Sequence, residues 1–351
     1  EVRTDGDCPS NYTLARTWTA TDDCGNETAH TQTLTVQDTT APELYRPGGD
    51  QTVQCDGEGN LDDLQLWLDT NAGAKATDNC GEMTWTNDFT QLTDECGMTG
   101  SALVTFTVTD ECGNSSSTSA LFTIVDTLAP TLDTEASDQT VECGPDNQNE
   151  LDAWLNSNGG ATATDICSGV TWSNDFSALS DDCGFTGSAT VTFTATDECG
   201  NEVSTTATFT IIDTTAPTFV EELPADATVE CDNVPDAATL TATDNCGDAT
   251  VTFSEERADG DCPSNYTLTR TWTATDECGN ESSHTQTITV QDITAPAFVE
   301  ELPADATVEC DNVPDAATLT ATDNCGDATV TFSEERADGD CPSNYTLTRT
   351  W

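Results

Sequence analysis

The sequence predicts an all-β chain of tandem immunoglobulin-like β-sandwich domains, two of them with a short inserted helix. Three observations lead to this prediction. Blocks of sequence recur at intervals of about 80–90 residues, apolar residues alternate with threonine inside each block, and four cysteines recur in every complete block. Alternation at period two indicates half-buried strands. Several short strands within one such block are typical of a sandwich.

The repeats are defined by internal identity and by a linker motif. Residues 219–272 are identical to residues 298–351, and the linker recurs as "VQDTTAP", "IVDTLAP", "IIDTTAP" and "VQDITAP". We therefore expect five units: a partial repeat at 1–38, a first long repeat at 39–126, a second long repeat at 127–213, a short repeat at 214–292 and a truncated last repeat at 293–351. Because the chain begins and ends inside a repeat, we expect it to belong to a longer protein.

Each expected element has its own signal. In the short repeat the strands are predicted by "ATLTATDN" (238–245), "ATVTFSEE" (249–256), "YTLTRTWTATD" (266–276) and "HTQTITVQD" (284–292). The inserted helices of the long repeats are predicted by "NLDDLQLWLDTNAG" (60–73) and "ELDAWLNSNGG" (150–160), where leucines recur at helical spacing. Trp67 and Trp154 are expected to hold these helices on the sandwich. The alternative is that they stack on carbohydrate, which would make a surface polysaccharide a partner.

A comparison of the repeats predicts core contacts. Phe253 and Trp272 in the short repeat correspond to Trp172 and Phe193 in the second long repeat, as if a facing aromatic pair had exchanged strands to conserve volume. Glu255 shares its strand's inward side with Phe253, and Arg270 shares its own with Trp272. We expect them to form an ion pair that recurs as Glu334–Arg349 and Glu1–Arg16.

The charge excludes several functions. The chain has 65 acidic and 8 basic residues, a net charge of −57, so it would repel nucleic acid and anionic membrane surfaces. No apolar run is long enough for membrane insertion. His30 and His284 are predicted to be surface residues on the outward side of a strand, without the neighbours that a catalytic site requires. An enzyme is therefore not expected.

The cysteines predict disulfides and an extracellular location, because 17 cysteines accompany only two histidines. Topology places the first and third cysteines of a repeat at one end of the sandwich and the second and fourth at the other. We therefore predict Cys231–Cys262 and Cys246–Cys278. The equivalent pairs are Cys55–Cys96, Cys80–Cys112, Cys143–Cys183, Cys167–Cys199 and Cys310–Cys341, with the partners of Cys8, Cys24 and Cys325 left open.

Aspartates of three elements should converge where a linker enters a repeat. In the short repeat these are Asp213 of the linker, Asp244 of a loop and Asp276 of the octapeptide "TATDECGN". Carboxylates in irregular geometry suit calcium, so calcium is the expected cofactor, and the alternative is that these residues only cap turns. The equivalent sets are Asp38, Asp78 and Asp110; Asp126, Asp165 and Asp197; and Asp292 with Asp323.

Several motifs carry a resemblance to a known family. The segments "TATDECGN" (273–280) and "TQTITVQDITAPAF" (285–298) resemble HYR, or hyalin-repeat, domains. The combination of "DQTVEC" (138–143), "LDAWLNSNGGATATD" (151–165) and "VTFTATDECGN" (191–201) resembles the HYR-like arrays of very large flavobacterial surface proteins. These include gliding-motility adhesins exported by the type IX secretion system. "DTL" at 126–128 also fits the pattern of Bacteroidetes O-glycosylation, which makes Thr127 a candidate site.

The resemblance implies an extracellular protein on a bacterial cell surface. We expect an adhesin stalk whose tandem domains carry an adhesive region away from the cell. The alternative is a subunit of a multi-chain extracellular filament. The expected partners are neighbouring repeats of the same chain and, in the filament, identical chains.

Overall fold

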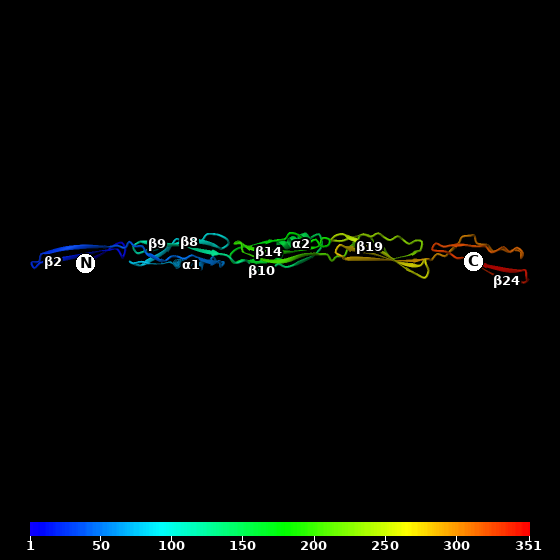
Figure 1. The fold of residues 1–351 in the computed structure, drawn as a ribbon. Coiled ribbons are helices and arrows are strands. Elements are labelled where there is room, and N and C mark those ends of the chain that lie inside the picture. The colour runs from blue at the N-terminus through cyan, green and yellow to red at the C-terminus, as the bar shows by residue number, and fades with distance from the viewer. The chain divides into compact units, whose positions relative to one another are not determined.

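The computed structural model describes residues 1–351 and is nearly all β (Figure 1). By its internal contacts the chain divides into two compact units. One contains Glu1–Gln139, Gln148–Ala178 and Ala189–Phe209, and the other contains Thr140–Asn147, Leu179–Ser188 and Thr210–Trp351. The division passes through the second long repeat.

Each complete repeat has a four-stranded sheet and a separate two-stranded sheet. The strands of the first long repeat are β4 (Glu43–Arg46), β5 (Gln51–Gln54), β6 (Lys75–Thr77), β7 (Met83–Asn87), β8 (Gly100–Asp110) and β9 (Ser115–Val125). Those of the second are β10 (Thr131–Thr134), β11 (Gln139–Glu142), β12 (Thr162–Thr164), β13 (Val170–Asn174), β14 (Gly187–Asp197) and β15 (Glu202–Ile212). Those of the short repeat are β16 (Thr218–Phe219), β17 (Ala227–Glu230), β18 (Ala242–Thr243), β19 (Ala249–Asp259), β20 (Tyr266–Asp276) and β21 (Glu281–Gln291).

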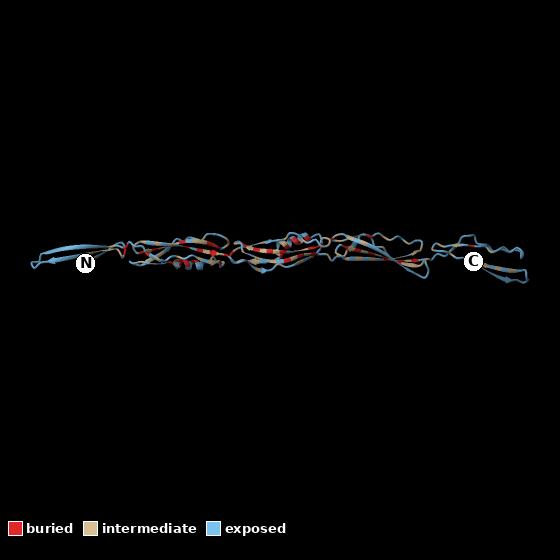
Figure 2. Cartoon of the chain, in the orientation of Figure 1, coloured by how far each residue is buried: buried red, intermediate tan, exposed pale blue.

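The end segments have fewer strands. The partial repeat contains β1 (Val2–Asp5), β2 (Tyr12–Thr21) and β3 (Glu27–Val36) in one sheet. The last repeat contains β22 (Ala297–Phe298), β23 (Ala321–Thr322), β24 (Ser333–Asp338) and β25 (Tyr345–Thr350), in two pairs. Most residues of these segments are exposed, whereas buried residues concentrate in the helices and in the long strands of the complete repeats, β8, β9, β14, β15, β20 and β21 (Figure 2).

The four-stranded sheets share one topology. Their orders are β5-β9-β8-β7, β11-β15-β14-β13 and β17-β21-β20-β19. The first strand of each sheet lies at one edge, and β5 and β17 run parallel to the last strand of their repeat. The strand pairs β7–β8, β8–β9, β13–β14, β19–β20 and β20–β21 are antiparallel. The tandem immunoglobulin-like sandwich fold predicted from the alternating pattern is confirmed.

The inserted helices pack on the long repeats as predicted. They are α1 (Leu61–Asp69) and α2 (Asn147–Asn156), each followed by a 3₁₀ turn, η1 (Asn71–Gly73) and η2 (Asn158–Gly160). Trp67 of α1 is 3% exposed and lies 5.2 Å from Phe106 and 5.3 Å from Phe122, between ring centroids. Trp154 is buried in the same way on Phe193. Buried rings cannot stack on a sugar, so the carbohydrate alternative for Trp67 and Trp154 is wrong. No helix of the chain combines the length and apolar composition needed to cross a membrane.

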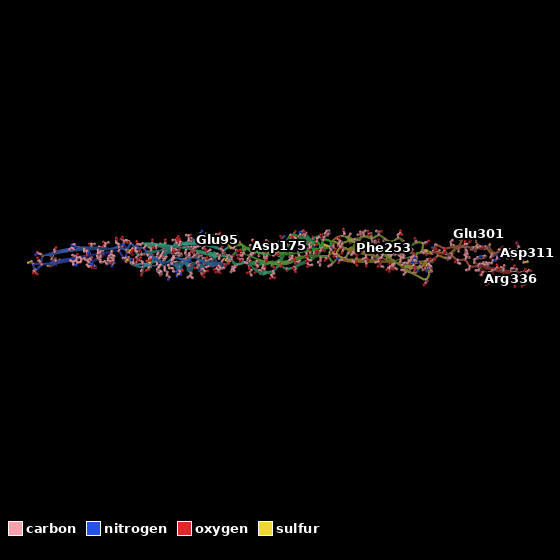
Figure 3. The ribbon with its side chains drawn as sticks, in the orientation of Figure 1. Glu95, Asp175, Phe253, Glu301, Asp311 and Arg336 are labelled. Carbon is pink, nitrogen blue, oxygen red and sulfur yellow. A yellow bond between two sulfur atoms is a disulfide. The ribbon has the colours of Figure 1, made fainter.

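The predicted aromatic exchange is correct in one repeat and wrong in the other. Phe253, labelled in Figure 3, faces Trp272 across β19 and β20. Their ring centroids are 5.2 Å apart, although Phe253 is 48% exposed. In the second long repeat Phe193 faces Asn174, and Trp172 lies two residues before the position equivalent to Phe253. The buried tryptophan on Phe193 is Trp154 of α2, a helix that the short repeat lacks.

Two polar predictions have different outcomes. Arg270 is buried and contacts Glu255 at 2.7 Å, and the same 2.7 Å pair recurs as Glu334–Arg349 and Glu1–Arg16. His284 was expected to face outward, but it is half-buried and stacked on Trp272. Its Nε2 donates to the Pro224 carbonyl at 2.8 Å. The inward side of β21 therefore includes this histidine as a packed polar residue.

Candidate functional site

The junctions between successive repeats are closed by disulfides. The first cysteine of a repeat bonds to the second cysteine of the next, and the third bonds to the fourth of the next. The bridges are Cys8–Cys112, Cys55–Cys167, Cys96–Cys199, Cys143–Cys246, Cys183–Cys278 and Cys231–Cys325. Their Cα atoms lie 5.1 to 6.1 Å apart. The first and second long repeats share two bridges, as do the second long and short repeats.

The predicted pairing within repeats is therefore wrong, although the assignment of cysteines to ends is right. Cys231 follows β17 and Cys262 follows β19, both at the end where β21 finishes. However, β17 and β19 are opposite edges of the sheet. Three strand spacings separate them by about 14 Å, which exceeds the roughly 6 Å that a disulfide allows. The cysteines at this end instead reach the opposite end of the following repeat.

The same correction applies to the other predicted pairs: Cys246–Cys278, Cys55–Cys96, Cys80–Cys112, Cys143–Cys183, Cys167–Cys199 and Cys310–Cys341. None of these forms. Five exposed cysteines have no bridge: Cys24, Cys80, Cys262, Cys310 and Cys341. Each occupies a position whose equivalents elsewhere bond to a neighbouring repeat, and no cysteine at the complementary position is present in this sequence.

Backbone contacts accompany the bridges. The Met98 N–H donates to the Cys167 carbonyl at 2.9 Å, and the equivalent Phe185 N–H donates to the Cys246 carbonyl at 2.8 Å. Gly184, next to Phe185, has φ +55°, and a Cβ there would lie 2.1 Å from the Cys246 carbonyl oxygen. Glycine at this position therefore permits both the left-handed backbone and the close approach of the next repeat.

The octapeptide "TATDECGN" is a junction element. In the second long repeat its cysteine, Cys199, bonds to Cys96. Its glutamate, Glu198, accepts a hydrogen bond at 3.1 Å from the Gly97 N–H of the preceding repeat. Its asparagine, Asn201, donates to the Asp126 carbonyl of the linker at 3.3 Å. Three of the eight residues thus attach the hairpin tip to the preceding repeat and the linker.

Acidic clusters lie at the same junctions. One ligand atom from each of Asp38, Asp78 and Asp110 lies within 4.8 Å of the others, and the same holds for Asp213, Asp244 and Asp276. The linker, loop and hairpin aspartates predicted from the sequence are therefore brought together at these two junctions. Like charges at this separation repel one another unless a cation or proton intervenes.

The other two junctions differ from the predicted sets. One cluster contains Asp126, Asp165 and Cys167, without Asp197, whose carboxylate is held by Asn201 at 2.8 and 2.9 Å. The other contains Glu230, Asp292 and Cys325, without Asp323. Cys167 and Cys325 are in disulfides, so neither is available as a thiolate ligand.

Sequence reasoning missed the residue before the first cysteine of each repeat. At this position Gln54 donates from its amide to Asp126 Oδ1 at 3.1 Å. Glu142 accepts hydrogen bonds from Thr214 and Thr215 of the linker, and Glu230 lies with Asp292. The signal was present, because a glutamine or glutamate recurs there in every repeat that contains a first cysteine.

One carboxylate oxygen at each junction is buried and has no hydrogen-bond partner in the protein. These atoms are Asp78 Oδ1, Asp126 Oδ2, Asp244 Oδ1 and Asp323 Oδ2. A buried polar atom without a partner costs free energy. Its recurrence at one atom per junction indicates a position that a ligand would satisfy.

The aspartates also cap turns, which was the alternative prediction. Asp276 Oδ1 accepts from the N–H groups of Cys278 and Asn280, and Asp244 Oδ2 accepts from the Cys246 N–H. Burial acts to raise the pKa of Asp276, but the Asn280 hydrogen bonds outweigh it and the pKa is lowered. Asp213 differs, because burial and the charges of Asp244, Asp276 and Glu142 raise its pKa. Turn capping thus gives hydrogen bonds to the carboxylates of Asp244 and Asp276, but the carboxylate of Asp213 in the linker is still repelled by both.

Comparisons with known proteins agree with the repeat pattern. Residues 219–290 match the HYR-like domain with 4 cysteines, which supports the HYR-like family for the short repeat. No curated protein matches the chain.

Several solved cadherin structures are similar at low identity. The Protocadherin GammaB4 extracellular domain is 12% identical with a TM-score of 0.33, over 94% of this chain and 62% of that chain. The Protocadherin gammaB7 EC3-6 cis-dimer structure is 15% identical with a TM-score of 0.31, over 86% and 88%. Mouse Cadherin-23 EC22-24 is 12% identical with a TM-score of 0.28, over 72% and 99%. This chain therefore spans less than two thirds of the Protocadherin GammaB4 structure.

Proposed function

We propose that this chain is part of the stalk of an extracellular adhesin, a spacer that carries an adhesive region away from a bacterial cell surface. The observation that carries the proposal is the double disulfide at the junctions that flank the second long repeat. A spacer must keep its domains in series, and two bridges per junction do so covalently. Disulfides also require an oxidising compartment. No catalytic role is proposed.

The bacterial surface and a role in gliding motility rest on the resemblance to flavobacterial arrays. An antibody against the chain should label intact cells that produce it. Labelling should be lost when the type IX secretion machinery is deleted. Labelling only after permeabilisation would contradict the surface location, and labelling that survives the deletion would contradict this export route.

A multi-chain filament is the second candidate, because near-identical tandem repeats also suit association between chains. Electron micrographs of the oxidised protein distinguish the two functions. Isolated thin threads support the stalk, whereas ordered multi-chain fibres support the filament.

We further propose that the acidic clusters bind calcium. The fit rests on converging carboxylates and on the orphaned oxygens, among them Asp126 Oδ2 on a side chain that is 9% exposed. Calcium accepts carboxylate and carbonyl oxygens in irregular geometry. The residues that would hold it are Asp38, Asp78 and Asp110; Asp126 and Asp165; Asp213, Asp244 and Asp276; and Asp292 with Glu230. The bound ion would supply positive charge and hold the linker against two loops of the next repeat.

Calorimetric titration of the calcium-free chain tests the proposal. We expect heat of binding that falls in the Asp244→Asn variant, because its orphaned oxygen belongs to the cluster at the short repeat. Asp236→Asn is the matched control, since Asp236 is exposed and outside the clusters. No binding by the parent chain, or equal loss in both variants, would contradict calcium at the junctions.

O-glycosylation of Thr127 remains a separate proposal. Its hydroxyl donates to Gln54 at 2.9 Å, and mass spectrometry of the native protein tests it.

A further inference from the structure

The inter-repeat bridges change the covalent route along the chain. In the second long repeat, three points connect to the preceding repeat: the linker at Asp126, Cys167 and Cys199. Three others connect to the following repeat: Cys143, Cys183 and the linker at Asp213. The chain runs between these two sets five times, and we call each of these segments a pass. One end of every pass is attached to the preceding repeat and the other end to the following repeat, through a bridge or a linker.

The first and last passes, which begin or end at a linker, are little longer than a folded strand. Cys143 follows Asp126 by 17 residues, and Asp213 follows Cys199 by 14 residues. A fully extended stretch of 14 residues spans about 48 Å at about 3.4 Å per residue. The folded β14 strand has 11 residues and spans about 36 Å. An unbridged repeat of 87 residues, 127–213, would extend to about 300 Å.

We propose that the inter-repeat disulfides form a load path that bypasses most of each repeat, so that the array resists unravelling under tension. Pulling on the ends first loads the short passes. Once these are taut, the remaining passes of the same repeat carry no further extension, whether or not the sandwich stays folded. This goes beyond the spacer function, because a spacer need only hold distance, whereas this arrangement limits the length gained when a domain unfolds.

The four bridges of the second long repeat are not equivalent in this respect. Through Cys143–Cys246 the covalent route leaves for the short repeat after the first pass. Through Cys96–Cys199 it arrives from the first long repeat just before the last pass. Either bridge alone keeps the route short. Cys183–Cys278 alone does not, because 57 residues separate Asp126 from Cys183. Cys55–Cys167 alone fails for the same reason, because 46 residues separate Cys167 from Asp213. The position of a bridge therefore matters more than the number of bridges.

Force spectroscopy of the oxidised 351-residue chain tests this, with handles at both ends and the five unbridged cysteines replaced by serine. Two matched variants each retain one of the four bridges that flank the second long repeat, with both cysteines of the other three replaced by serine. One retains Cys143–Cys246 and the other retains Cys183–Cys278. Both keep Cys8–Cys112 and Cys231–Cys325.

We expect the two variants to differ in total contour length by about 240 Å, the length of roughly 70 residues at about 3.4 Å each. The variant with Cys143–Cys246 should match the parent chain. Contour length counts the covalent route and does not depend on folding, so a variant that fails to fold still gives an answer. Equal contour lengths in the two variants, or a gain of about 240 Å when the oxidised parent is stretched, would overturn the proposal.

Discussion

Cutting the linker between the second long repeat and the short repeat should leave the two halves of the chain joined. A protease site inserted between Thr215 and Ala216 allows the cut. Two bridges, Cys143–Cys246 and Cys183–Cys278, connect residues before the cut to residues after it. On a non-reducing gel the cut protein should therefore run as one species, and it should separate into residues 1–215 and 216–351 only after reduction.

The stabilisation that each bridge contributes depends on the length of the loop that it closes. Cys143–Cys246 closes 103 residues and Cys183–Cys278 closes 95 residues. On the chain-entropy view, a loop of this size contributes about 4.7 kcal/mol by restricting the unfolded state. Replacing both cysteines of one bridge by serine should lower the free energy of opening in the short repeat by about 4 kcal/mol. Hydrogen exchange of the β20 amides before cleavage measures this change.

The variants make the gel decisive. Removal of either bridge alone should leave the cut halves joined, and removal of both should separate them without a reducing agent. If the unmodified chain separates after cleavage without reduction, the cysteines pair within repeats and the account of the junctions is refuted. Peptide mapping of the separated halves would then identify the pairs that form instead.

Three further outcomes are expected. Trp272→Ala should lower the local free energy of unfolding by about 3–5 kcal/mol, because the side chain is 1% exposed, whereas Phe253→Ala should cost about 1 kcal/mol; equal losses by hydrogen exchange would contradict the burial difference. Asp213→Asn should raise the melting temperature at pH 7 without calcium and lower it with calcium. The raised pKa of Asp213 means that its charge costs stability above that pKa, and the cost disappears once the pH falls below the ordinary value of 3.8; a change of the same sign in both conditions would contradict the cluster. Gln54→Glu should strengthen calcium binding by adding a carboxylate beside Asp126, and unchanged titration heats would remove this position from the site.

Local patterns were sufficient to predict the strands, the helices and the meeting of linker, loop and hairpin aspartates. The period-two alternation of "YTLTRTWTATD" specifies which side of β20 is buried. In α1, Leu64 and Leu68 of the predicted helical spacing are buried beside Trp67, whereas Leu61, the first leucine of that spacing, is 68% exposed. Each of these features depends on residues within one repeat. The aspartates Asp213, Asp244 and Asp276 converge because strand directions alone bring their segments to one end of the sandwich.

The disulfide partners could not be predicted from a single repeat. The spacing of Cys231, Cys246, Cys262 and Cys278 is the same whether they pair within a repeat or between repeats. The choice depends on lateral position, because two cysteines at one end can still lie on opposite edges of a sheet. The unbridged cysteines are consistent with pairing between neighbours. They lie in the two end segments and in the repeats next to them, and each lacks a cysteine at the complementary position of an adjacent repeat.

Covalent and ionic contacts at a junction have separate roles. With a net charge of −57, neighbouring repeats repel one another, and the repulsion is strongest at the clustered carboxylates, where separations are well below the Debye length of about 8 Å. The bridges hold Cys143 to Cys246 and Cys183 to Cys278 whatever the charge state. Removal of calcium would therefore loosen the linker around Asp213 without disconnecting the repeats. Reduction without chelation would leave the repeats joined by one linker and the proposed ion. Reduction and chelation must therefore be applied independently to distinguish the contribution of the disulfides from that of the ion.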